Sequence, residues 1–133
     1  MATALEDGDE DLQRRIRFHR ERRPCGWGTL EIGGLDEVLK AAERWEAVLL
    51  DSLTLWVSAR EEPALPEFDR FLTRAGDLTV PLLLVSDEVG LGVVPESEEG
   101  RRFRDVLGLV NQRAAAAAEE VHLCVAGVGI RIK

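Results

Sequence analysis

The sequence predicts a single α/β domain over residues 1–133, with a mainly parallel sheet flanked by helices. Short apolar runs of strand length alternate with segments of helical periodicity. The first of these runs ends in a carboxylate, Asp51, and glycine or proline residues separate most of the segments. A hydrophobic fraction of 45% and a charged fraction of 32% are typical of a chain that forms a core.

In the first part of the chain we expect helices over 12–23, 35–44 and 68–75 and a strand over 47–51. The first helix follows a run of acidic residues and ends at Pro24, and the second follows two glycines. The strand, AVLLD, is short and apolar, as expected of a buried parallel strand. The third helix is bounded by Pro63 and Pro66 before it and by Gly76 after it.

In the second part we expect strands over 79–86 and 121–126, a short edge strand over 129–133 and a helix over 98–120. The helix carries apolar residues at helical spacing, followed by an alanine run of high helix propensity. Parallel sheets bind ligands beyond the carboxyl ends of their strands. Asp51 and the loop 86–88 are therefore expected on one functional edge.

Composition excludes several classes of protein. A formal net charge of -8 argues against nonspecific binding of nucleic acid. No apolar run approaches the ~20 residues that span a bilayer, and no charged-then-apolar leader opens the chain, so we expect no membrane insertion. Cys25 and Cys124 have neither metal-site spacing nor the density of a disulfide scaffold, which favours a reducing cytoplasm.

The stretch 12–23, LQRRIRFHRERR, places His19 among six arginines, against the overall charge. Guanidinium groups match phosphate oxygens geometrically, and a histidine among them can attack phosphorus. Leu12, Ile16 and His19 fall on one helical stripe. The alternative interpretation is a solvated basic helix face.

Asp51 is the second candidate. In nucleotide enzymes a carboxylate at the end of a buried strand holds Mg²⁺ beside the phosphates. The alternative is a carboxylate that serves solubility or helix capping. The sequence contains no G-x-x-x-x-G-K-[ST] motif, which a mononucleotide site normally shows.

Six blocks of the sequence together resemble the bifunctional adenosylcobinamide kinase / adenosylcobinamide-phosphate guanylyltransferase family of cobalamin biosynthesis. They are Ala2–Ala4, Arg15–Pro24, Trp27–Glu31, Leu49–Trp56, Val85–Glu96 and Gly100–Gly127. The resemblance implies a P-loop NTPase-like (RecA-like) fold, a cytoplasmic homotrimer and two activities. These are phosphorylation of adenosylcobinamide by GTP or ATP, and transfer of GMP from GTP to adenosylcobinamide phosphate through a guanylylated histidine.

By position, the resemblance makes His19 the guanylylated histidine. It implies nucleotide contacts at Ala2, Thr3, Ala4, Arg20, Glu21, Arg22, Arg23, Glu31 and Asp51. It also makes Asp51 the ligand of Mg²⁺.

The chain departs from the family pattern at two notable places. The family's first strand, phosphate loop and first helix are missing before the Ala2–Ala4 block, which implies loss of kinase activity, weaker GTP binding and exposed apolar surface on the sheet. Asp87 stands where family members commonly have asparagine. Two other interpretations stay open: a catalytically silent member that acts as a nucleotide-binding or assembly subunit, and an unrelated phosphate-binding domain.

Overall fold

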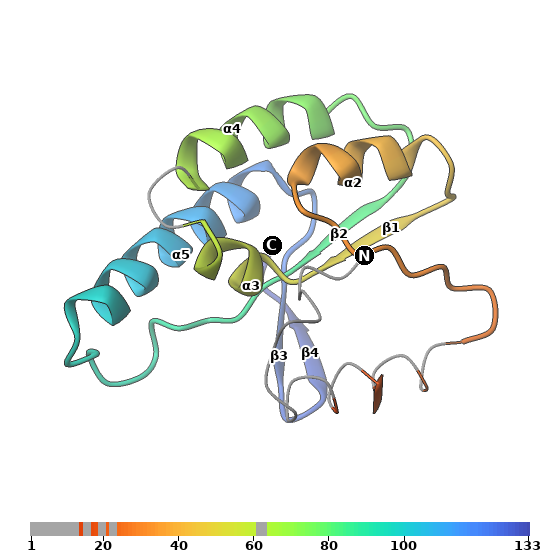
Figure 1. Cartoon of the computed structure of the whole chain (residues 1–133). Coiled ribbons are helices and arrows are strands. Elements are labelled where there is room, and N and C mark those ends of the chain that lie inside the picture. Colours follow the sequence, from red (N-terminus) through yellow and green to blue (C-terminus); the bar gives the residue numbers. More distant parts are fainter. Residues whose placement is uncertain (1–13, 15–16, 19–20, 22–23, 61–63) are drawn as a thin grey trace.

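The computed structural model describes residues 14, 17–18, 21, 24–60 and 64–133. Its elements are α2 (Leu35–Ala42), β1 (Val48–Asp51), α3 (Leu53–Ser58), α4 (Ala64–Ala75), β2 (Leu82–Val85), α5 (Glu98–Ala117), β3 (His122–Val125) and β4 (Val128–Arg131). The helices gather along one side of β1 and β2, and the hairpin of β3 and β4 extends away from them (Figure 1). The predicted α/β class with a parallel sheet is confirmed.

β1 and β2 form a two-stranded parallel sheet with register from Val48↔Leu82 to Asp51↔Val85. Because successive side chains of a strand face opposite sides, Val48 and Leu50 point into the core while Asp51 shares the other face with Val85. On that second face Leu83 is 49% exposed and Val85 is 40% exposed. Parallel sheets usually bury both faces. In the described structure this second face therefore exposes apolar side chains.

The core lies between the covered face of the sheet and the helices. α2 contributes one stripe of side chains at i, i+3, i+4 and i+7, namely Leu35, Val38, Leu39 and Ala42. Three aromatic rings form the centre, with Trp56 and Phe68 centroids 6.0 Å apart and Phe68 and Phe71 centroids 5.8 Å apart. α4 packs against both α2 and α5, and α5 adds the fully buried Leu107 and Val110.

The hairpin corrects one expectation. We expected the strand near 121–126 to join the mainly parallel sheet, but in the described structure β3 pairs only with β4, antiparallel, from His122↔Arg131 to Val125↔Val128. The turn between them has positive φ at both central residues, 50° at Ala126 and 80° at Gly127. Such a turn matches the twist of two antiparallel strands, so local geometry pairs β3 with its sequence neighbour.

Other differences concern element ends. α4 begins at Ala64, so Pro66 lies within its first turn, where the missing N–H is not needed for a helical hydrogen bond. α3 was not predicted; Ser52 is its N-cap residue, and the Ser52 Oγ accepts from the Leu55 N–H at 3.3 Å. The other predicted elements from residue 35 onward begin and end within three residues of those observed.

For the predicted helix over 12–23, the described residues Arg14, Arg17, Phe18 and Glu21 have helical conformation and are exposed. Its other residues, including His19, lie outside the described part of the chain. Within the described residues, no helix has both the length and the apolar character needed to cross a bilayer.

Candidate functional site

The carboxyl ends of β1 and β2 meet at one edge of the parallel sheet. Asp51 is the last residue of β1, is half-buried and lies in register with Val85. The chain then turns directly into α3 through the buried Ser52. A partly buried carboxylate therefore stands at the sheet edge, on the face that the helices leave open.

Three hydrogen bonds fix the segment that leaves β2 at this edge. The Asp87 N–H donates to Thr54 Oγ1 at 2.9 Å, and Asn111 Nδ2 donates to the Asp87 carbonyl oxygen at 3.0 Å. The Ser86 hydroxyl donates to Asn111 Oδ1 at 2.6 Å. We call Thr54, Ser86, Asp87 and Asn111 the sheet-edge clamp. Because α3 and α5 hold both backbone polar groups of Asp87, the start of the loop after β2 has a defined direction.

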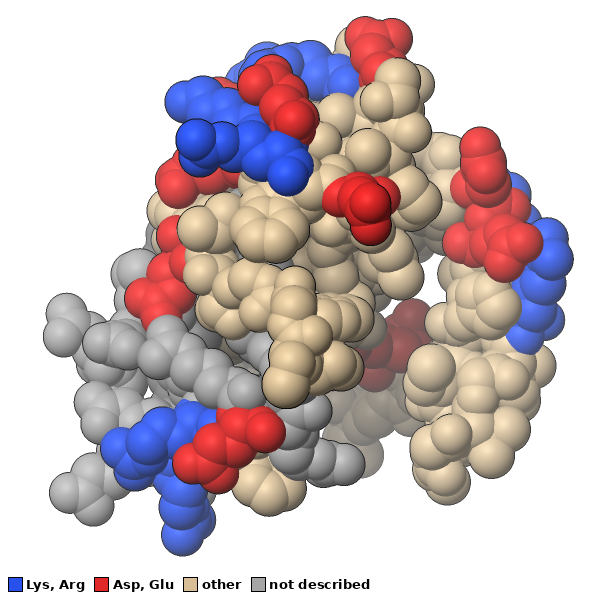
Figure 2. Space-filling model, turned by 90° about the vertical axis from the view of Figure 1, so that its right-hand side faces the viewer, with Lys and Arg blue, Asp and Glu red and all other residues tan. Residues whose placement is uncertain are grey.

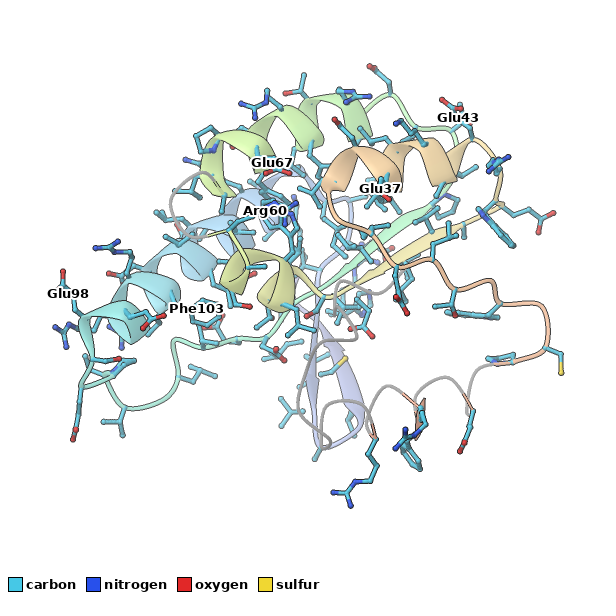
Figure 3. All side chains as sticks on the ribbon, in the orientation of Figure 1. Glu37, Glu43, Arg60, Glu67, Glu98 and Phe103 are labelled. Atoms are coloured by element: carbon cyan, nitrogen blue, oxygen red, sulfur yellow. The ribbon has the colours of Figure 1, made fainter. Side chains whose placement is uncertain are left out.

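A second cluster, centred on Arg60, serves the fold. Figure 3 shows Arg60 pointing from the end of α3 toward Glu67 on α4. Arg60 Nε lies 3.0 Å from Glu67 Oε2, and the two side chains are 21% and 29% exposed. The guanidinium also donates to the Gly33 carbonyl and lies 5.1 Å from the centroid of the Trp56 ring. Arg60 thus links α3 and α4 to the turn before α2, and we assign it no ligand.

Arg113 has a similar structural role. Its Nη1 donates to Asp69 Oδ2 at 2.7 Å and to the Leu65 carbonyl at 3.4 Å, which ties α5 to α4. Sequence reasoning gave no role to either Arg113 or Asn111. It missed the sheet-edge clamp as well, although two hydroxyl residues, Ser52 and Thr54, lie within three residues after the strand-end carboxylate and could have indicated polar contacts there.

Figure 2 shows one side of the molecule hollowed, with acidic atoms at the base of the hollow and charged side chains on the upper part of the right-hand wall. Within the described residues, no group of three or more histidine, cysteine, aspartate or glutamate side chains could hold a metal ion. A cation at the sheet edge would therefore need oxygen atoms from a bound phosphate as well as protein carboxylates.

Of the predicted site residues, the structure describes three. Asp51 lies at the sheet edge, Glu31 is exposed and forms a single β-bridge, and Glu21 is exposed in a helical segment. Their common role in nucleotide binding stays a prediction. The remaining predicted residues, Ala2, Thr3, Ala4, His19, Arg20, Arg22 and Arg23, lie outside the described part of the chain.

Comparison with known proteins places the chain in a family. The sequence model of the cobinamide kinase / cobinamide phosphate guanyltransferase family matches residues 1–132. The bifunctional adenosylcobalamin biosynthesis protein CobU of Escherichia coli K12 is 37% identical over 145 residues, covering 94% of this chain and 80% of that protein.

Two further relatives match the chain with similar identity and coverage. The CobU protein of Salmonella typhimurium is 35% identical over 145 residues, with the same coverage of both chains. The bifunctional adenosylcobalamin biosynthesis protein CobP of Pseudomonas aeruginosa is 39% identical over 140 residues, covering 100% of this chain and 80% of that protein. An unrelated phosphate-binding domain is thereby excluded. The chain belongs to the cobinamide kinase / cobinamide phosphate guanyltransferase family.

Proposed function

We propose that this protein transfers GMP from GTP to adenosylcobinamide phosphate, forming adenosylcobinamide-GDP in cobalamin biosynthesis. The observation that carries the proposal is the family match over residues 1–132, together with relatives whose names assign them to adenosylcobalamin biosynthesis. The α/β architecture with a parallel sheet and a strand-end carboxylate supports a P-loop NTPase-like (RecA-like) fold. We further propose that residues 1–133 act as one domain and that the protein works as a cytoplasmic homotrimer.

In the proposed mechanism His19 is the nucleophile. A neutral imidazole nitrogen attacks the α-phosphorus of GTP, an N–P bond forms, and the bond to the leaving pyrophosphate breaks. A phosphate oxygen of adenosylcobinamide phosphate then attacks the same phosphorus, which breaks the N–P bond and restores the imidazole. Arg20, Arg22 and Arg23 offset the charge on the phosphate oxygens during both steps. Ala2, Thr3, Ala4, Glu21 and Glu31 contact the nucleotide.

Asp51 is the proposed Mg²⁺ ligand. The donor chemistry fits, because Mg²⁺ is commonly bound by one or two carboxylates together with substrate phosphates and water. Asp51 supplies one such carboxylate, half-buried at the sheet edge. Mg²⁺ bound there would offset negative charge on the phosphates of GTP.

The family name includes a second activity, phosphorylation of cobinamide. That reaction needs a phosphate-cradling site for GTP or ATP, and the sequence contains no G-x-x-x-x-G-K-[ST] motif. We therefore propose the guanylyl transfer as the reaction to test first.

The test uses the covalent intermediate. The protein is incubated with GTP and Mg²⁺, and its intact mass is measured for an acid-labile GMP adduct. His19→Ala should abolish the adduct. His122→Ala is the matched control, because His122 is exposed on β3 and its Nε2 contacts Glu120 Oε2 at 3.1 Å. An adduct that survives His19→Ala would contradict the mechanism, and GTP binding without any adduct would favour a silent nucleotide-binding subunit.

A further inference from the structure

The loop between β2 and α5 exposes an unusual amount of apolar surface. Val93 is 95% exposed, Leu91 is 84% exposed and Val94 is 56% exposed. No charged side chain occurs between Val89 and Pro95. Contiguous apolar surface of this kind commonly marks a binding site.

This loop is held at both ends. At its start the sheet-edge clamp fixes the N–H and carbonyl of Asp87, and Glu88 Oε1 accepts from the Gly90 N–H at 2.7 Å. At its end Arg101 Nη1 donates to the Pro95 carbonyl at 3.0 Å and to the Glu96 carbonyl at 2.6 Å. The three apolar side chains therefore project from a loop whose two ends are already fixed in the free protein, which lowers the entropy cost of binding.

The position of the loop points to one ligand. It begins directly after Val85, which is in register with Asp51, so it starts at the edge where the proposed nucleotide site lies. The proposed reaction requires the phosphate of the corrinoid substrate to reach the α-phosphorus of GTP. The rest of that substrate must then lie beside the same edge. A corrin ring is a large macrocycle that carries methyl groups as well as amide side chains, and binding sites for ligands of this size are lined mainly by apolar side chains with a few polar groups.

We propose that Leu91, Val93 and Val94 form the platform on which the corrin ring of the substrate rests. This proposal depends on the proposed function, since it takes the corrinoid as the second substrate. The clamp and Arg101 act as positioning groups for the platform. The structure thereby assigns a corrinoid subsite to residues that sequence reasoning left without a role.

The experiment measures binding of adenosylcobinamide at equilibrium by ultrafiltration, with the corrin absorbance of the free fraction as the signal. Val93→Ser should raise the dissociation constant about tenfold, because a valine that becomes buried on binding contributes about that factor. Val93→Ser combined with Val94→Ser should raise it further. Neither change should unfold the protein, because both side chains are exposed in the free protein.

Val128→Ser is the matched control: it makes the same chemical change at a valine that is 63% exposed on the β3–β4 hairpin, and it should leave the dissociation constant unchanged. The proposal would be overturned if Val128→Ser raised the dissociation constant as much as Val93→Ser does, or if the loop variants left the dissociation constant unchanged. So would a wild-type protein that does not bind adenosylcobinamide at millimolar concentration.

Two further readouts separate this proposal from its rivals. Formation of the GMP adduct, which needs no corrinoid, is measured on the same wild-type preparation and reports on the proposed function alone. Corrinoid binding that depends on Val93 supports the platform even if no adduct forms. Light scattering after gel filtration reports the oligomeric state. Loop variants that change the oligomeric state while corrinoid binding stays intact would show that the apolar loop is a contact between copies of the chain.

Discussion

Asn111 on α5 and Asp87 after β2 are joined by a hydrogen bond of 3.0 Å from Asn111 Nδ2 to the Asp87 carbonyl oxygen. The same amide accepts a hydrogen bond from Ser86 through its Oδ1 at 2.6 Å. One side chain on the longest helix thus holds two consecutive residues at the carboxyl end of β2. The link matters because the proposed nucleotide site and the apolar loop both begin at this edge.

Asn111→Ala should lower the free energy of unfolding by about 1 to 3 kcal/mol, because it leaves the Ser86 hydroxyl and the Asp87 carbonyl without their partner. Urea unfolding followed by circular dichroism measures this difference. Gln112→Ala, on the exposed face of the same helix, is the control and should change stability by no more than about 0.5 kcal/mol. Equal losses in the two variants would show that the clamp contributes nothing.

Asp51→Asn should raise the Mg²⁺ concentration needed for half-maximal formation of the GMP adduct by at least about tenfold, because the neutral amide is a poorer ligand for a hard cation. The adduct is measured by intact mass over a series of Mg²⁺ concentrations. Asp77→Asn is the control, since Asp77 is exposed in the turn after α4 and lies toward the opposite end of the sheet, before β2. An unchanged Mg²⁺ requirement in Asp51→Asn would remove this residue from the site.

Arg60→Ala should destabilise the protein by about 2 kcal/mol, because it leaves the partly buried Glu67 carboxylate and the Gly33 carbonyl without their donor. Arg60→Lys should lose less stability, since lysine keeps the positive charge but lacks the planar guanidinium group with its several N–H donors. Thermal unfolding measures both, with the exposed Arg70→Ala as the reference for an arginine on a helix surface. A full recovery with lysine would mean that charge alone, and not the geometry, holds α3 to α4.

Ala126→Gly should stabilise the β3–β4 hairpin by about 0.5 to 1 kcal/mol, because φ at Ala126 is 50° and a side chain there is strained. Gly127→Ala should destabilise it by about 1 kcal/mol for the same reason, since φ at Gly127 is 80°. Amide hydrogen exchange of the paired residues in β3 and β4 measures each effect separately from global unfolding. Shifts of the same sign in the two variants would contradict this account of the turn.

Part of the candidate site could be predicted from the sequence alone. A short apolar run ending in a carboxylate predicted β1 and Asp51 at its end, and this is confirmed. Roles for Asn111, Thr54 and Arg113 could not be predicted, because their hydrogen-bond partners lie 24, 33 and 44 residues away in the sequence, on other elements or loops. Helical periodicity shows which face of an element is buried, but it does not show which polar group on another element a side chain will contact.

The sequence by itself determined the kind of each long element and the family. Helical spacing of apolar residues specified α5, the apolar run specified β1, and the sequence blocks identified the family that the comparisons then showed. The tertiary structure alone decided that β3 pairs with β4, that α3 forms at all, and that one sheet face stays open. The physical reason is that strand pairing and six-residue helices depend on contacts between distant residues and on turn geometry, which local patterns do not contain.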